Sequence, residues 1–344
     1  MTEPKEPAPA AAGLPTKVRR ASLRERLARN PPDARLWVGA ALLGLYLFAA
    51  LSALVVFRGA VQSVAITGAW IYPSPVYPPS WSHPFGVLPG VGVDLFRYLW
   101  VATPWDLSMV VGILLIDTVI GVLLGAVAGA HEGGVADSVV TFVGDSFATI
   151  PTFFFVIIVF SGIATVEPAS AGIPAFVAVF GVVLWPTMAR AVRERARSVA
   201  QMKYVEAARA SGATRRHVLF RHIIPNSLGP ALAQIPLDVA PIFFVLSAFP
   251  WFFNCASTPP PPPFPGAPPA YYLIPVLPAF SPLPSPNFPE WGFALAIGAC
   301  EGISYPGQWN YWWMYLFPFL MIIGLALGIA LLCDGLERWL RTYH

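Results

Sequence analysis

The chain has 344 residues, of which 56% are hydrophobic and only 11% are charged, and its formal net charge at pH 7 is +3. A composition so apolar and so poor in charge excludes an ordinary soluble globular protein. It predicts an integral membrane protein.

The N-terminal segment, residues 1–35, contains the basic run KVRRASLRERLAR and leads directly into the first apolar stretch. Beside a membrane helix, such a segment is expected to lie on anionic membrane lipid in the cytoplasm and not to bind nucleic acid. It has no apolar core and small-residue cleavage site of a signal peptide, so we expect it to be retained.

Six stretches are apolar and long enough to cross a bilayer, which takes roughly 20 helical residues. The fifth contains four prolines, and a membrane helix tolerates such breaks only where neighbouring helices or a water-filled path satisfy the freed backbone groups. We therefore expect the fifth span to be strongly kinked or to line a pore. The predicted spans are residues 36–57, 108–130, 139–163, 173–191, 228–253 and 311–333, and the prolines are Pro230, Pro236, Pro241 and Pro250.

Two long connections are predicted outside the cell, residues 58–107 and 254–310, on either side of a core of helices at 108–253. The second contains TPPPPPFPGAPPAYY, and proline at this density lacks backbone donors and favours extended polyproline II. It is expected to act either as a stiff spacer or as a surface that packs on the membrane domain or on an external partner. Cys255 and Cys300 flank it, and a disulfide between them is a hypothesis.

The basic residues predict the orientation. Residues 1–35 hold eight Lys and Arg, residues 190–222 hold nine, and the tail of the final segment 311–344 holds two, which together are nineteen of the twenty-one. The positive-inside rule therefore places both termini and the 190–222 segment in the cytoplasm.

The cytoplasmic segment within 190–226 contains YVEAARASGATRRHVLFRHIIPN. Good helix formers at Glu206, Ala207 and Ala208 are followed by Gly212, where the chain can turn sharply before a second short helix. Ile224 and Pro225 end that helix and direct the chain back to the membrane. The pattern predicts a compact helix pair on which another protein can dock.

No catalytic or metal-binding pattern is present in the sequence. The five His residues are scattered, no Cys and His spacing resembles a zinc site, and no GxxxxGK[ST] loop exists to bind ATP phosphates. The chain is therefore expected to be no enzyme and to need no cofactor, and any ATP-driven motor must be another chain.

The 204–226 segment resembles the EAA signature of the permease subunits of binding-protein-dependent ABC importers. The signature residues here are Glu206, Ala207, Ala208, Gly212, Ile224 and Pro225, with Ile where the family usually has Leu. Further motifs resemble the C-type subunit of oligopeptide, dipeptide and nickel importers. They are HPFG at 83–86, IGVLLGAVAG at 120–129, GDSFATIP at 144–151, EWG at 290–292 and DGLERWL at 334–340.

The resemblance implies a plasma-membrane permease subunit of a prokaryote, forming half of a path for a peptide-like solute. The implied partners are a second permease of similar fold, two ABC ATPase subunits and an extracytoplasmic substrate-binding protein. The segment around Glu206 to Gly212 would seat on an ATPase and transmit its closure to the membrane helices.

The chain departs from the family pattern on the outer face. VLPGVGVD follows HPFG where an acidic, glycine-rich stretch is usual, keeping only Asp94, and the proline-rich insertion replaces a short connection. Because substrate would meet the permease there, oligosaccharides or a metal stay open as substrates. An ion-driven secondary transporter is the alternative of another class, although no internal repeat is visible.

Acidic residues inside predicted spans cost about 2.5 to 3.5 kcal/mol on insertion scales, so they are functional candidates by default. Asp117, Asp145 and Asp238 are in such positions. For Asp145 we expect a hydrogen bond within the bundle interior. Asp117 and Asp238 are candidates for the translocation path, with helix packing as the alternative.

Overall fold

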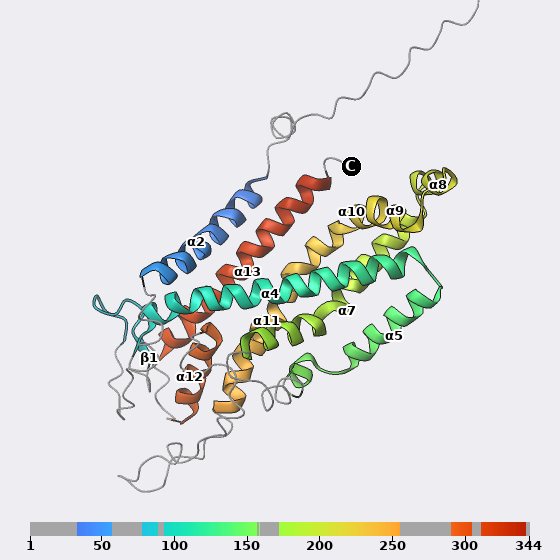
Figure 1. The fold of residues 1–344 in the computed structure, drawn as a ribbon. Helices are drawn as coiled ribbons and strands as arrows, with labels where there is room; N and C mark the ends of the chain where they lie inside the picture. Colours follow the sequence, from blue (N-terminus) through green and yellow to red (C-terminus); the bar gives the residue numbers. More distant parts are fainter. Residues whose placement is uncertain are drawn as a thin grey trace, which may run out of the picture.

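A computed structural model describes residues 33–56, 78–88, 93–156, 158, 172–254, 290–304 and 311–341. This part of the chain is a bundle of long helices with a short helical hairpin at one end and a two-stranded turn near the other (Figure 1). The elements are α2 (Ala34–Val56), β1 (Val87–Leu88), β2 (Val93–Asp94), α4 (Leu95–Ala130), α5 (Val135–Thr149), α7 (Gly172–Ala200), α8 (Lys203–Ala210), α9 (Arg215–Val218), η2 (Leu219–Ile223), α10 (Ile224–Asn226), α11 (Leu228–Asn254), α12 (Trp291–Ser304) and α13 (Trp312–Arg341).

Five helices are long and apolar enough to cross a membrane, namely α2, α4, α7, α11 and α13. The prediction of an all-helical membrane protein is confirmed, and the six predicted spans are confirmed for five. The other one, 139–163, is only partly described, because α5 ends at Thr149 and residues 159–171 lie outside the described part. Pro151 follows α5 and separates it from a short helical turn.

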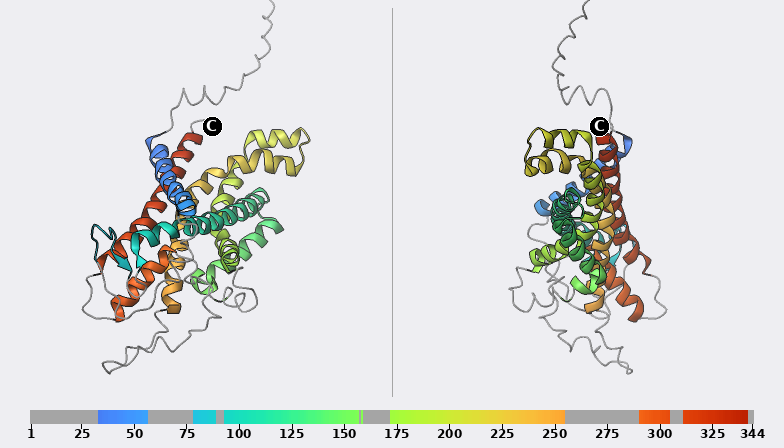
Figure 2. Two further views of the ribbon diagram at one scale, coloured as in Figure 1. Left: turned by 60° about the vertical axis from the view of Figure 1, so that its left-hand side comes forward. Right: turned by 90° about the vertical axis from the view of Figure 1, so that its right-hand side faces the viewer.

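The ends of the helices fall into two groups. The first turn of α2, the last turn of α13 and the hairpin lie at one end of the bundle, and all three views in Figures 1 and 2 agree on this. Two ion pairs join the start of α2 to the end of α13 there: Arg35 with Asp334 at 2.6 Å, and Arg338 with Asp33 at 3.9 Å. The strands β1 and β2 and the helix α12 lie toward the other end.

Helix α4 begins earlier than the sequence predicts. Residues 95–107, expected in the first external connection, form its first turns. Asp94 caps the helix, since its Oδ1 accepts a hydrogen bond from the Arg97 amide at 2.8 Å, while its Oδ2 lies 2.9 Å from Nδ1 of His83. Arg97, Pro104 and Asp106 interrupt the hydropathy of this stretch, which is why it reads as a loop.

Helix α12 is a second difference, because the sequence predicts all of 254–310 as a proline-rich loop. Residues 255–289 lie outside the described part, but the EWG motif begins a helix. Trp291 is fully buried and donates hydrogen bonds from its amide to Asp106 at 3.0 Å and from Nε1 to the Leu99 carbonyl at 3.0 Å. The motif therefore anchors α12 to α4.

Helix α11 runs from Leu228 to Asn254 as one helix in spite of its four prolines, and the expectation that it is kinked or lines a pore stays a prediction. Its prolines still leave backbone carbonyls without their helical donors, and Leu246 is the residue whose carbonyl Pro250 cannot bond. Gly292 of α12 packs against this turn so closely that a Cβ there would lie 2.7 Å from the Leu246 oxygen. A neighbouring helix thus covers the turn whose hydrogen bonding the proline interrupts.

Candidate functional site

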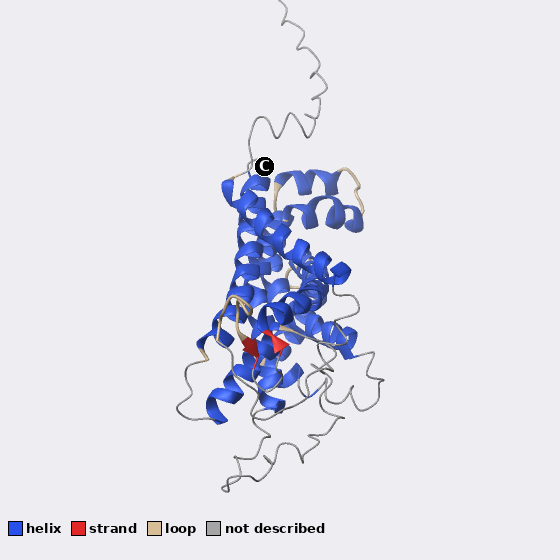
Figure 3. Cartoon of the chain, turned by 90° about the vertical axis from the view of Figure 1, so that its left-hand side faces the viewer, coloured by secondary structure: helices blue, strands red, loops and turns tan. Residues whose placement is uncertain are grey.

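The helix pair predicted from the sequence is present, and we call residues 203–226, which comprise α8, α9, η2 and α10, the hairpin. It follows α7 after a two-residue break and leads into α11 (Figure 3). Its first helix is α8, and α9, η2 and α10 form one continuous second helix. The view in Figure 3 shows the two arms side by side, projecting from the bundle at the end where α13 finishes.

Gly212 makes the sharp turn between the two arms. Its φ is +84°, and the amide of Ala213 donates to the Ala208 carbonyl at 3.1 Å while that of Gly212 donates to the Arg209 carbonyl at 3.0 Å. This is a Schellman arrangement, in which glycine is favoured because the left-handed conformation is unstrained without a Cβ. Ala208 and Gly212 are therefore tied together by the same backbone geometry.

The second arm begins at a capped end and passes through a widened turn. Thr214 caps it, accepting a hydrogen bond at its hydroxyl from the His217 amide at 3.3 Å. Further along, η2 is a π-helical turn in which the amide of Ile224 reaches the Leu219 carbonyl. Pro225 comes next, and its nitrogen has no hydrogen to continue the ladder. The arm nevertheless continues to Asn226, one residue beyond the predicted end, and only Ser227 separates it from α11.

Apolar residues fix the hairpin to the bundle. Val205 of α8, Val218 of α9 and Ile223 of η2 are at most 2% exposed and share one hydrophobic cluster with side chains of α4 and α7. Glu206, Ala207 and Gly212 lie on the other side and are exposed. Hydrophobic burial thus orients the hairpin so that these three signature residues face outward.

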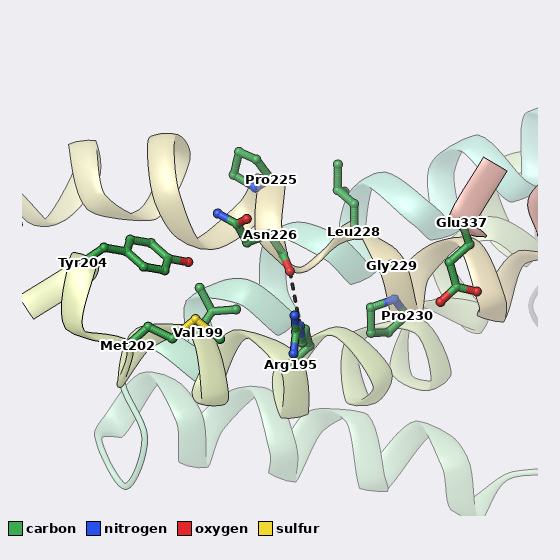
Figure 4. A pocket seen from close by; sticks show the side chains of 10 residues that line it. All are labelled: Arg195, Val199, Met202, Tyr204, Pro225, Asn226, Leu228, Gly229, Pro230 and Glu337. Carbon is green, nitrogen blue, oxygen red and sulfur yellow. Dashed lines mark hydrogen bonds between the residues drawn. The ribbon is translucent and has the colours of Figure 1, made fainter. Parts of the chain in front are cut away.

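A cavity of about 700 Å³ lies at the base of the hairpin, between the end of α7, the start of α11 and the end of α13 (Figure 4). In it, Arg195 donates a hydrogen bond from Nε to the Asn226 carbonyl at 3.4 Å. Ile224 is half-buried beside the cluster, and Pro225 is exposed and lines the cavity. The cavity is lined by Arg195, Val199, Met202, Tyr204, Pro225, Asn226, Leu228, Gly229, Pro230 and Glu337.

The nine basic residues of the 190–222 segment fall into two groups. On α7, Arg190, Arg193 and Arg197 pair with acids of α5 and the turn before it, and Arg195 bonds the Asn226 carbonyl. The other five lie on the hairpin, are exposed, and make no ion pair with an acid among the described residues. They are Lys203, Arg209, Arg215, Arg216 and Arg221. The hairpin therefore presents a strongly cationic surface with Glu206 as its one acid.

The sequence singles out Asp117 and Asp238, and the structure brings them together. Asp117 of α4 is 0% exposed and Asp238 of α11 is 3% exposed, and their carboxyl groups lie next to one another. Asp238 also accepts hydrogen bonds from Gln234 at 2.9 Å and from Thr187 of α7 at 3.3 Å. Both acids thus lie inside the helix bundle of this chain.

Sequence reasoning missed the acids that pair with α7. Asp137 accepts hydrogen bonds from Nε of Arg193 at 2.5 Å and from Nη2 at 3.1 Å, and this hydrogen bonding holds the pKa of the Asp137 carboxyl below its usual range. Asp145 differs from expectation, because it is exposed and pairs with Arg190 at 3.0 Å instead of bonding within the bundle interior. The helical spacing of 190, 193 and 197 is the signal that could have indicated a shared face.

The thiols bear little on this site. Cys333 on α13 is free and buried. Cys255 and the side chain of Cys300 lie outside the described residues, so the disulfide hypothesis stays a prediction.

Comparison with known proteins places the chain in a family. Residues 121–342 match the family described as the inner membrane component of binding-protein-dependent transport systems. A Brucella ovis protein assigned to peptide permeases is 33% identical over 162 residues, which cover 47% of this chain and 51% of the relative, so the match spans about half of that relative's length.

Other relatives match more of the chain. The oligopeptide transport system permease protein OppC of Bacillus subtilis is 28% identical over 70% of this chain and 75% of its own length. The dipeptide transport system permease protein DppC of the same organism is 26% identical over 76% and 68%. With the family match extending over the hairpin and four of the five membrane helices, in whole or in part, the chain belongs to the inner membrane components of binding-protein-dependent transport systems and is a multi-pass, non-catalytic permease subunit.

Proposed function

We propose that the chain forms half of a path through which an importer moves a peptide-like solute, driven by ATPase subunits that dock on the hairpin. The observation that carries this proposal is the division of the hairpin into two faces. Val205, Val218 and Ile223 hold it to α4 and α7, while Glu206, Ala207 and Gly212 remain exposed. An exposed face with small side chains, fixed to the membrane helices, suits the docking of an ATPase whose movement must be passed on to those helices.

The proposed cycle uses two states of the assembly. ATP binding closes the ATPase dimer, the hairpin moves with it, and the membrane helices rock so that the path between two permeases opens outward to receive solute from a binding protein. Hydrolysis reverses the movement. In the orientation predicted from the basic residues, the hairpin and both termini lie in the cytoplasm. Membrane lipid surrounds the exposed apolar faces of the spans.

Peptides are the proposed substrate class because the relatives are named as peptide, oligopeptide and dipeptide permeases. Oligosaccharides or a metal remain the alternative for the same architecture. Isolating the binding protein with its ligand would distinguish them, since mass spectrometry of the released ligand identifies its class directly.

The partners can be tested by purifying the tagged chain from its native membrane in mild detergent. We expect a second permease, ATPase subunits and the binding protein to remain attached. Recovery of this chain alone in several detergents, with no ATPase activity, would overturn the proposal and favour an ion-driven transporter.

Glu206→Lys tests the docking face within that assembly. We expect the variant to insert normally but to lose most of the coupling between hydrolysis and uptake, because it reverses the one acid on the outward face. Ser198→Lys, which adds a positive charge at an exposed position of α7, is the matched control and should couple normally. Full uptake by Glu206→Lys would exclude this residue from docking.

Asp117 and Asp238 stay candidates for the path, and in this chain both are buried between α4, α7 and α11. Asp238→Asn keeps the shape of the side chain and can still bond Thr187 and Gln234. We expect altered uptake with intact assembly. Unchanged uptake at normal expression would leave helix packing as their role.

A further inference from the structure

Three basic side chains of α7 form a ladder with acids that precede or belong to α5. Arg190 pairs with Asp145, Arg193 with Asp137, and Arg197 with Glu132, whose carboxylate also accepts from Gln201 at 3.3 Å. The positions on α7 recur every three or four residues and so lie on one face of the helix. The ladder leads along α7 toward the hairpin.

The Arg193–Asp137 pair is the best formed of the three. Both carboxylate oxygens are held by the guanidinium fork, and Oδ2 accepts a further hydrogen bond from the Gly133 amide at 3.0 Å. The side chains are 24% and 8% exposed, against 59% and 61% for Arg190 and Asp145. A bidentate, largely buried pair keeps its geometry far better than a pair in solvent.

Helix α5 has few other attachments. Asp137 and Gly144 are its only buried residues, and Gly144 lies against Trp185 and Pro186 of α7. Most of its apolar side chains are exposed, among them Val135 at 82% and Phe142 at 74%, although Phe147 packs on Trp185 of α7 with the ring centroids 6.3 Å apart. The usual means of fixing a helix, an apolar face in the core, is therefore largely missing from α5, and the ion pairs take its place.

We propose that the Arg193–Asp137 pair, supported by Arg197 and Glu132, makes α5 and the hairpin one moving unit. The inference rests on the proposed function: a displacement imposed on the hairpin reaches α7 through the chain itself, and reaches α5 through the Arg193–Asp137 pair, with the exposed Arg190–Asp145 pair contributing little. Arg193 and Asp137 are thus positioning residues for coupling, and they touch neither ATP nor solute.

The test uses the full complex with its second permease, ATPases and binding protein in proteoliposomes. In a background with Cys255, Cys300 and Cys333 replaced, Asp137→Cys and Arg193→Cys are combined. Without cross-linker, we expect uptake per ATP hydrolysed to fall by about fivefold, a size typical of changes along coupled networks. Joining the two cysteines with a short bis-maleimide should restore it, because the covalent link replaces the ion pair.

Two further variants sharpen the result. Arg193→Lys keeps the charge but loses the fork of the guanidinium. Its uptake per ATP hydrolysed should therefore lie between that of the parent and that of the unlinked double-cysteine variant. Asp145→Cys with Arg190→Cys, at the exposed rung, is the matched control and should change coupling little, linked or not.

Either of two results would overturn the inference: normal coupling without the link, or loss of uptake with the link in place, which would mean that α5 and α7 must slide past one another. If the unmodified complex hydrolyses ATP but moves no solute in any preparation, the proposed function fails instead, and the two failures are distinguishable.

Discussion

Gly212 has a conformation that other residues can adopt only at a cost. A Cβ at this position would meet no atom within 4 Å, so the effect of a substitution comes from the backbone, whose φ is +84°. A left-handed conformation costs an L-residue roughly 1 to 2 kcal/mol.

Gly212→Val is therefore expected to strain or open the turn, lowering uptake per ATP hydrolysed while membrane insertion stays normal. Gly212→Asn should be milder, because Asn tolerates this conformation. Gly44→Val on α2, where space is equally open and φ is not positive, controls for the added side chain. Uptake by Gly212→Val at the level of the Gly44 variant would show that the turn's geometry is unimportant.

The ion-paired carboxyl group of Asp137 makes the stability of the folded protein depend on pH. Its pKa is lower in the folded protein because Arg193 donates hydrogen bonds to it, so the unfolded chain binds a proton more readily. The stabilisation is therefore present above the unfolded pKa, about 3.9 for Asp, and is lost as the pH falls through the folded value.

The melting temperature of Arg193→Gln in detergent should lie below that of the parent. We expect this deficit, the difference between the two melting temperatures, to be constant from neutral pH to about pH 5 and to shrink in more acidic buffer. Arg195→Gln is the control, since Arg195 bonds a carbonyl and not an acid. Its deficit should not change over the same range. A constant deficit for Arg193→Gln would mean that Asp137 is not its energetic partner.

Residue identity alone predicted the hairpin but not the ladder, for a physical reason. The turn at Gly212 and the stop at Pro225 depend on neighbours a few residues away, so local chemistry reveals them. Arg193 and Asp137 are 56 positions apart, and their pairing depends on how α5 lies on α7. The same holds for Asp117 and Asp238, which were recognised as costly acids but not as neighbours.

At the level of elements, hydropathy predicted the long apolar helices and failed where polar or proline residues interrupt them. The first turns of α4 contain Pro104 and Asp106, and the buried Asp106 carboxylate accepts a hydrogen bond from the Trp291 amide. Helix α12 follows a proline-rich stretch and has only fourteen residues, too few for a span by composition. Both elements depend on contacts with residues far away in the sequence, which no local pattern can show.

The hairpin's charges predict how it binds. If an ATPase docks on the hairpin as proposed, five exposed basic side chains without acidic partners among the described residues favour an acidic surface on that ATPase. Attraction between exposed charges weakens as salt shortens the Debye length. We expect binding of purified ATPase to the reconstituted permease to weaken between low and physiological salt.

The double variant Arg215→Glu with Arg216→Glu should reduce both the affinity of the permease for the ATPase and the salt dependence of that affinity. Arg190→Glu on α7 should alter neither. Retained affinity together with poorer retention on anionic vesicles would mean that these side chains serve the lipid surface instead.

For the molecule as a whole, the structure adds a constraint to the orientation predicted from basic residues. Arg35 and Asp334 join the first and last helices at the end of the bundle that carries the hairpin, so these three features must share one side of the membrane. The basic-residue count then favours the cytoplasm for all of them.

Single cysteines in the background without native cysteines test this orientation. In right-side-out vesicles, a membrane-impermeant maleimide should label Trp81→Cys, whose native side chain is fully exposed near β1, and should label Ser211→Cys at the tip of the hairpin only after permeabilisation. The opposite pattern would put the hairpin outside, where no ATPase could reach it. Labelling of Ser211→Cys in sealed vesicles would therefore invalidate the docking proposal together with the orientation, because the ladder, the cationic surface and the turn at Gly212 would then have no cytoplasmic partner to act on.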